Sequence, residues 1–185
     1  MPGVAESLPF PDGAFDAVAS RFALMFFADR RRALREALRV LRPGGRLSVG
    51  VWDSLESMSA YAAEVDLLER EAGRAAADAQ HAPFTLGDRN ELSALLAEAG
   101  VDWARVEARE GTARFPNVRT MLEADLRGWL PVMGVELTED AIGRVLRGAE
   151  RALAPHVTTD GRVEFRLSAL IATGRKPEPA ARRPD

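Results

Sequence analysis

The chain has 185 residues, of which 46% are apolar and 29% are charged, and its formal net charge is −3. This length and balance suit one globular domain, and the small negative charge excludes a general attraction to nucleic acid or anionic lipid. The absence of cysteine excludes disulfides, thiol nucleophiles and thiolate metal sites. His81 and His156 form no metal-binding motif. With no basic start, and no apolar run long enough to cross a bilayer, we expect a cytoplasmic protein without metal or membrane partners.

The first elements in chain order form a strand–helix–strand unit. Turn residues lead into the apolar run Phe15–Ser20, which is typical of a buried strand. Apolar residues then recur at steps of three and four up to residue 41, which predicts a helix with Asp29 as its N-cap and Gly44 as its left-handed C-terminal stop. Residues 46–52 predict a second strand. Short connections between these elements indicate a parallel βαβ unit in an α/β fold.

The rest of the chain predicts more helix than strand. Asp88 and Gly100 bound one of the helices as N-cap and stop, and Thr138 caps another. In chain order we expect a helix over 58–72, a loop over 73–87, a helix from 88 to 99, a strand over 103–109, helices over 117–130 and 138–154, and a strand over 163–171.

Two segments carry the most specific pattern. Residues 5–18 read A-E-S-L-P-F-P-D-G-A-F-D-A-V, and residues 39–47 read R-V-L-R-P-G-G-R-L. Together they resemble the later half of the class I S-adenosylmethionine-dependent methyltransferases, and the resemblance extends over about residues 3–175. It implies a partial Rossmann-like α/β sheet with strand order 4-5-7-6, an antiparallel last strand and a helical insertion before that strand. We expect one truncated methyltransferase domain over 1–175 and a disordered tail over 176–185.

The resemblance also implies a set of cofactor-binding residues. Val4, Ala5 and Glu6 match the segment beside the adenine ring, where Val4 replaces the aspartate that the family usually carries. Ser20, Arg21 and Phe22 follow the first predicted strand. They match the segment that faces the methionine part of S-adenosylmethionine and the substrate, in keeping with ligand binding at the carboxyl ends of parallel strands.

Other candidate residues have simpler interpretations. Gly44-Gly45 follows a helix and opens a strand, so it is not a phosphate-binding loop. A solvated helix face is favoured over phosphate binding for the arginines, which are Arg30, Arg31, Arg32, Arg35, Arg39, Arg42 and Arg46. Trp52 either lines a substrate pocket or fills the core, and both interpretations stay open. His81 is a conceivable general base, although a structural role is favoured.

One family feature is missing from the sequence. No strand is followed by Gly-x-Gly-x-Gly, and no next strand ends in an acid; the resemblance assigns these features to the methionine end and the ribose of the cofactor. We therefore expect an incomplete enzyme, inactive alone, whose complete form transfers a methyl group to a small-molecule acceptor. The strand over 15–20 would then be an exposed apolar edge that causes poor solubility or homodimerisation. The alternatives are a non-catalytic remnant that serves as a dimerisation or partner-binding module, and a half-enzyme completed by a separate chain.

Overall fold

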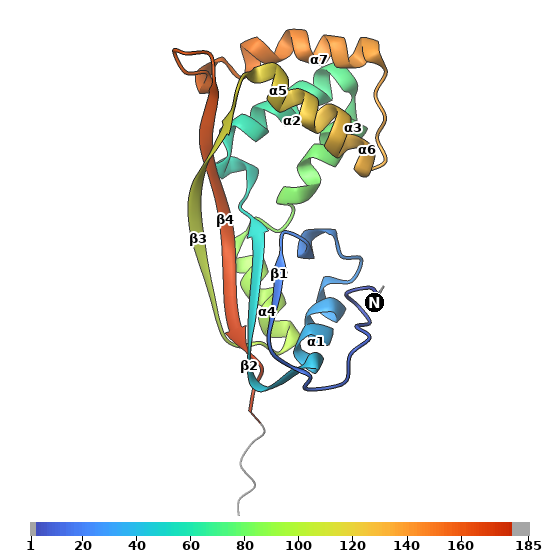
Figure 1. Ribbon diagram of the computed structural model, residues 1–185, viewed down its shortest axis with the longest axis vertical. Coiled ribbons are helices and arrows are strands. Elements are labelled where there is room, and N and C mark those ends of the chain that lie inside the picture. Colours follow the sequence, from blue (N-terminus) through green and yellow to red (C-terminus); the bar gives the residue numbers. More distant parts are fainter. Residues whose placement is uncertain (1–2, 179–185) are drawn as a thin grey trace, which may run out of the picture. The chain divides into compact units, whose positions relative to one another are not determined.

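The computed structural model describes residues 3–178, and these form two compact units (Figure 1). The first, here called the sheet unit, consists of the segment up to Trp52, residues 86–109 and the segment from Ala169. The second, here called the helical unit, consists of residues 53–85 and 110–168. Strands β3 (Asp102–Phe115) and β4 (Val163–Arg175) contribute residues to both units. The expectation of one methyltransferase domain over 1–175 stays a prediction.

The sheet has the strand order that the resemblance implies. Strands β1 (Phe15–Arg21) and β2 (Leu41–Trp52) are parallel neighbours, and the order of the described strands is β1-β2-β4-β3. β2 pairs with β4 in antiparallel fashion, with Val51 opposite Leu170. If β1 to β4 are taken as the family's fourth to seventh strands, this order is 4-5-7-6 with an antiparallel last strand, and that prediction is confirmed.

Two amphipathic helices belong to the sheet unit. Helices α1 (Arg30–Val40) and α4 (Arg89–Ala99) contact each other, and their apolar residues share one core with the strands. Asp29 caps α1 by accepting a hydrogen bond from the Arg32 backbone nitrogen at 2.9 Å, as predicted. The core of this unit includes Leu34, Leu38, Leu41, Leu47, Val49, Leu92, Leu96 and Leu170. The apolar stripes read from the sequence are thus the buried faces of both helices.

Part of the sheet remains open. Ala17 and Ala19 of β1 alternate with Val18, which packs on the core, and both alanines are exposed. Together with Ser48, Thr173 and the exposed side chain of Trp103, they line a hollow of about 440 Å³. In the described residues β1 stands at one end of the strand order, and Phe15 at its start is 36% exposed. The predicted exposed edge is therefore present in the structure.

The chain between α1 and β2 differs from the expectation. The helix ends at Val40, and Leu41 is already extended, so Gly44 does not cap the helix. Gly44 has a φ of 72°, and its nitrogen donates to the Lys176 carbonyl at 3.0 Å. The Lys176 nitrogen donates to the Gly45 carbonyl at 2.9 Å, so Lys176, expected in the tail, is held at the start of β2. The predicted tail beyond residue 178 lies outside the described residues.

The helical unit is built from helices α2 (Ser59–Ala72), α3 (Arg74–His81), α5 (Val118–Ala124), α6 (Leu130–Val132) and α7 (Glu139–Ala152), with the π-helical turn η4 (Asp125–Trp129) between α5 and α6. Asn117 and Thr138 cap α5 and α7 through their side-chain oxygens. The buried residues of the unit include Leu67, Leu68, Met121, Leu122, Leu130, Val145 and Val163. None of the described helices is long and apolar enough to span a membrane.

The prediction of a loop over residues 73–87 was wrong. Gly73, with a φ of 93°, ends α2, and α3 begins at the next residue. Alanine has the highest helix propensity, and residues 75–79 include four alanines. A glycine followed by a polar segment indicated a loop, whereas here the glycine only separates two helices.

Candidate functional site

The backbone is strained where β1 ends. Phe22 directly follows β1 and has a φ of 52°, in the left-handed region that a side chain with a Cβ rarely adopts. Such a conformation costs roughly 1–2 kcal/mol. It is held by a hydrogen bond from the Phe22 nitrogen to the Gly50 carbonyl at 2.8 Å. Strain of this kind concentrates at ligand-binding sites, where it fixes side chains in a set position.

The strained residue stacks on the end of the neighbouring strand. The rings of Phe22 and Trp52 are nearly parallel, with an interplanar angle of 22° and centroids 4.2 Å apart. Trp52 is the last residue of β2, so the two rings join the carboxyl ends of adjacent parallel strands. From the sequence, Trp52 could either line a substrate pocket or fill the core. The structure leaves it half-buried beside the predicted site residue Phe22.

Polar groups accompany this aromatic pair. Ser20 lies opposite Val49 in β2, and its hydroxyl oxygen is buried without a hydrogen-bond partner among the described residues. Arg21 is exposed, and its guanidinium carbon lies 6.0 Å from the centroid of the Phe22 ring. The end of β1 therefore offers an unpaired hydroxyl, a cation and an aromatic face within three consecutive residues.

The predicted adenine segment is tied to the same edge of the sheet unit. Residues Val4 to Ser7 form a turn, in which the Ser7 nitrogen donates to the Val4 carbonyl at 3.1 Å. The Glu6 carboxylate accepts a hydrogen bond from the Asp29 nitrogen at 3.2 Å, and the Glu6 carbonyl accepts from Arg32 Nε at 2.9 Å. Because α1 returns from the carboxyl end of β1, its N-terminus and this turn lie at that end.

The three residues of this segment differ in availability. Glu6 is engaged in holding the turn on α1, Ala5 is half-buried, and the Val4 side chain is 61% exposed. The structure brings Ser20, Arg21 and Phe22 together as consecutive residues at the end of β1. It places Val4, Ala5 and Glu6 at the same edge through Asp29. The sequence pattern did not indicate the left-handed conformation of Phe22. The available signal for the ring pair was an aromatic residue at the end of each of two neighbouring strands.

The arginines of α1 stabilise the surface of the sheet unit. Arg39 is the most connected of them: it pairs with Glu36 at 2.8 Å and with Asp12 at 2.7 Å, and it donates to the Leu8 and Phe10 carbonyls. This bonding holds the loop before β1 against α1. The Arg39 hydrogen bonds and the Leu8 amide lower the pKa of Glu36 to about 2. Arg39 is therefore a structural tether rather than the freely solvated residue we expected.

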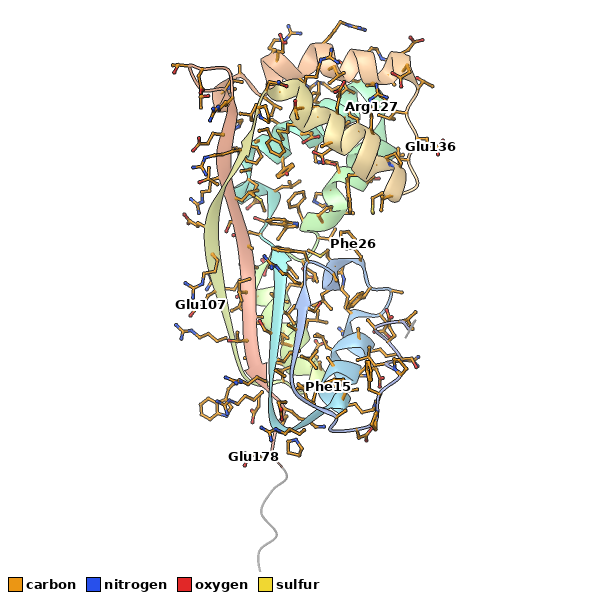
Figure 2. The ribbon with its side chains drawn as sticks, in the orientation of Figure 1. Phe15, Phe26, Glu107, Arg127, Glu136 and Glu178 are labelled. Atoms are coloured by element: carbon orange, nitrogen blue, oxygen red, sulfur yellow. The ribbon has the colours of Figure 1, made fainter. Side chains whose placement is uncertain are left out.

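The other sequence candidates lie in the helical unit. His81 is exposed at the end of α3, and the ring of His156 lies 6.0 Å from that of Phe165 in an edge arrangement. The described residues contain no group of three or more histidine, cysteine, aspartate or glutamate side chains able to hold a metal ion. In the sheet unit, Phe26 ends the short 3-10 helix Leu24–Phe26 after β1 and is exposed (Figure 2).

These groups suit the chemistry of S-adenosylmethionine. Arg21 can pair with a carboxylate, the Ser20 hydroxyl can donate or accept a hydrogen bond, and the aromatic rings offer π faces to a sulfonium cation. The unpaired Ser20 oxygen is the feature that most directly indicates a ligand, because buried polar atoms are almost always hydrogen-bonded.

Comparisons with known proteins show that the chain is similar to methyltransferases. Residues 1–49 match a family model described as a methyltransferase domain. Over 45 residues the chain is 60% identical to the ubiquinone/menaquinone biosynthesis C-methyltransferase UbiE of Hahella chejuensis. This alignment covers 24% of this chain and 18% of that protein. Over 174 residues it is 29% identical to the 27-O-demethylrifamycin SV methyltransferase of Amycolatopsis mediterranei. This alignment covers 94% of this chain and 57% of that protein. The chain thus spans less than two thirds of the length of these curated relatives.

Solved structures show the same fold. The protein BH2331 of Bacillus halodurans C-125, assigned as a methyltransferase, superimposes with a TM-score of 0.55 at 23% identity, covering 95% of this chain and 76% of that one. YcgJ of Bacillus subtilis superimposes with a TM-score of 0.54 at 21% identity, covering 96% and 70%. Residues 1–49 are therefore similar to a methyltransferase domain, and the chain shares the fold of these two solved structures.

Proposed function

We propose that this chain supplies the second half of the active site of a methyltransferase that acts on a small molecule. The observation that carries the proposal is the strained Phe22, stacked on Trp52 at the carboxyl ends of two parallel strands. When bound, S-adenosylmethionine would supply an electrophilic methyl group that passes to the acceptor by direct displacement, with S-adenosylhomocysteine as the leaving group. Positioning contributes much of the rate in such a displacement, so residues that fix geometry matter more than a dedicated base.

Each predicted site residue has a role in this proposal. Arg21 and Ser20 hold the polar methionine end, and Phe22 with Trp52 forms an aromatic wall beside the transferred methyl group. Val4 and Ala5 contact the adenine ring through apolar surface and backbone. Glu6 acts as a positioning residue, because its carboxylate is used to hold this turn on α1.

The active form also requires a glycine-rich segment that the 185 residues do not contain. Two features of the sheet unit support this part of the proposal. The exposed face of Ala17 and Ala19 lines a hollow instead of packing under a helix, and β1 ends the strand order of the described residues. In the family the missing strands pair with the equivalent of β1. The segment is supplied either by a longer form of this chain or by a separate one.

A hydroxyl-bearing small molecule is the first acceptor class to test. The relative that aligns over 94% of this chain is named for methylation of 27-O-demethylrifamycin SV, an oxygen acceptor. UbiE is named for carbon methylation in quinone biosynthesis, but it aligns over 24% of this chain. The helical unit follows β2 directly in the chain, at Asp53, and is our candidate for recognising the acceptor.

Calorimetric titration with S-adenosylhomocysteine tests the proposal. The 185-residue chain is compared with a form that carries the in-frame upstream codons at its locus. We expect weak or no binding by the chain alone, and micromolar binding by a form that contains a glycine-rich segment. If such a form folds and still fails to bind at millimolar cofactor, the proposal is wrong.

A non-catalytic dimerisation module is the second candidate, and the exposed edge strand β1 favours it. Unpaired strand edges recruit other strands, so two copies can pair through β1. Size-exclusion chromatography with light scattering distinguishes the states. A dimer that the Ala19→Lys variant converts to a monomer supports this candidate, whereas a stable monomer of the unaltered chain contradicts it.

A further inference from the structure

The helical unit contains a carboxyl group in an unusual place. Glu64 of α2 is 0% exposed, and it lies among the apolar core residues of the unit. Neither of its carboxyl oxygens has an N–H or O–H donor among the described residues. A buried carboxylate without a donor or a cation is strongly disfavoured, because desolvation of the charge costs several kcal/mol. Glu64 must therefore be neutral or share its charge with a neighbour.

That neighbour is a second carboxyl group, on Asp125. The Glu64 and Asp125 side chains are within hydrogen-bonding reach of each other, and the Gln80 side chain also bonds Asp125. Asp125 is the first residue of the π-helical turn η4. Trp129 Nε1, at the end of this turn, donates a hydrogen bond of 3.0 Å to the Ala79 carbonyl of α3. Three elements, α2, α3 and η4, thus bring two carboxyls and one amide together.

Charge elsewhere in the unit does not neutralise the pair. Arg127, labelled in Figure 2, lies on the same turn as Asp125 and donates to the Glu139 carboxylate of α7 at 2.6 Å. On α7, Arg144 donates to the Glu71 carbonyl of α2, and on α3, Arg74 pairs with Asp78 at 3.6 Å. His81 is exposed at the end of α3. Tyr61 of α2 also interacts with the pair. Its pKa is raised mainly by burial and to a smaller extent by the charges of Asp125 and Glu64.

We propose that Glu64 and Asp125 hold one proton between them and make the helical unit a pH-sensitive element. Two carboxyl groups can hydrogen-bond to each other only if one is protonated. Because no other donor among the described residues reaches Glu64, a proton on Glu64 supplies the O–H donor for its contact with Asp125. Glu64 carries the proton, because it is the more deeply buried of the two. Asp125 accepts from it and from the Gln80 amide.

The electrostatics agree with this arrangement. Burial raises the pKa of Glu64 well above 4.5, and it raises the pKa of Asp125 to about 6. A carboxyl whose pKa is higher in the folded than in the unfolded state stabilises the fold below its unfolded value. That stabilisation is lost as the pH rises through the folded value. The helical unit therefore loses stability as the pH rises, and the first loss is expected near pH 6.

Carbon-13 NMR of the unaltered chain, labelled at glutamate and aspartate carboxyls, tests the proposal directly. We expect the Glu64 signal to stay at the chemical shift of a neutral acid through pH 7, and the Asp125 signal to move near pH 6. A Glu64 signal that titrates near 4.5, as for an exposed glutamate, overturns the proposal.

Thermal unfolding of variants gives an independent readout. Glu64→Gln keeps the shape and removes the ionisable group, so its melting temperature should exceed that of the unaltered chain by about 4 °C at pH 8 and match it at pH 4.5. Glu69→Gln, at an exposed position of α2, is the matched control and should follow the unaltered chain at both pH values. An identical pH dependence for Glu64→Gln and the unaltered chain contradicts the proposal. If Glu64→Gln does not fold, the NMR titration decides.

Discussion

Carboxyl groups in the two units of the molecule have opposite environments. In the sheet unit, Glu36 accepts hydrogen bonds from Arg39 and from the Leu8 amide, which lower its pKa to about 2. In the helical unit, Glu64 has no such donor, and burial raises its pKa. The same chemical group is therefore an ionised hydrogen-bond acceptor in the sheet unit, whereas we propose that it is protonated in the helical unit.

The difference shows where each unit keeps its unsatisfied groups. The sheet unit uses its charges to fix the loop before β1, and its unpaired hydroxyl and strained residue, Ser20 and Phe22, lie at the strand ends where ligands bind. The helical unit keeps its unpaired oxygens inside its core. The first arrangement fits a ligand site, whereas the second fits a titratable structural element.

Matched core truncations should give the largest effects and test whether the two cores are equally important. Leu96 in the sheet unit and Leu122 in the helical unit are almost fully buried. Each substitution to alanine should lower the free energy of unfolding by about 2–5 kcal/mol, because it removes apolar contacts and leaves a cavity. Chemical denaturation measures this loss. A cost below about 1 kcal/mol in either unit would show that its core is not packed as described.

Phe22→Gly sharpens the functional side of the comparison. Glycine relieves the left-handed strain, but it removes both the stacking on Trp52 and the packing of Phe22 on the core, so the free energy of unfolding should fall by about 1–2 kcal/mol. Binding of S-adenosylhomocysteine by a cofactor-binding form should fall by about tenfold or more, equal to roughly 1.4 kcal/mol. Calorimetry measures both quantities.

Trp103→Gly is the matched control for that variant. Trp103 also has a positive φ, of 53°, but its side chain is 84% exposed in β3. We expect this substitution to leave cofactor affinity unchanged. Equal losses of affinity in the two variants would mean that Phe22 has no special role.

Removal of helix caps should cost less than removal of core side chains and about the same in each unit. Asp88 caps α4 of the sheet unit, accepting from two backbone nitrogens, and Thr138 caps α7 of the helical unit. Substitution of either by alanine should lower the free energy of unfolding by about 1 kcal/mol. Thermal unfolding at neutral pH measures the effect, and a neutral result for Asp88→Ala would contradict the observed capping geometry.

The smallest effect is the acid titration of Glu36, opposite in sign to that of Glu64. Since its pKa is lowered, the stabilisation by Glu36 is complete above about pH 4.5 and is lost as the pH falls toward 2. The Leu8 amide donates to this carboxylate at 2.9 Å, so its proton chemical shift should report the titration. A midpoint near 2 agrees with the structure, and a midpoint near 4.5 would show that the Arg39 tether is not formed.

Most of the fold could be predicted from the sequence, because its signals are local. The stripe of Leu34 and Leu38 and the caps Asp29, Asp88 and Thr138 define helices without reference to the rest of the chain. The strand order came instead from the family resemblance. The helix over Arg74–His81 was missed because Gly73 marks a helix boundary in the same way that it would mark a loop.

The candidate site was only partly predictable. Ser20, Arg21 and Phe22 followed from the family pattern after a strand. The left-handed Phe22, the ring contact with Trp52 and the proximity of Glu64 to Asp125 depend on residues that are far apart in the sequence or on backbone angles. Such features arise from tertiary packing, which periodicity and composition do not encode.

Amide chemical-shift mapping with S-adenosylhomocysteine tests the central claim, that the carboxyl ends of β1 and β2 form the cofactor site. The measurement uses the form of the protein that binds the cofactor. We predict that the largest shifts in this chain fall on Ala5, Glu6 and Ser20 to Phe22, together with the Trp52 indole. Shifts confined to the helical unit, or to the far ends of these strands at Phe15 and Gly44, would contradict the claim.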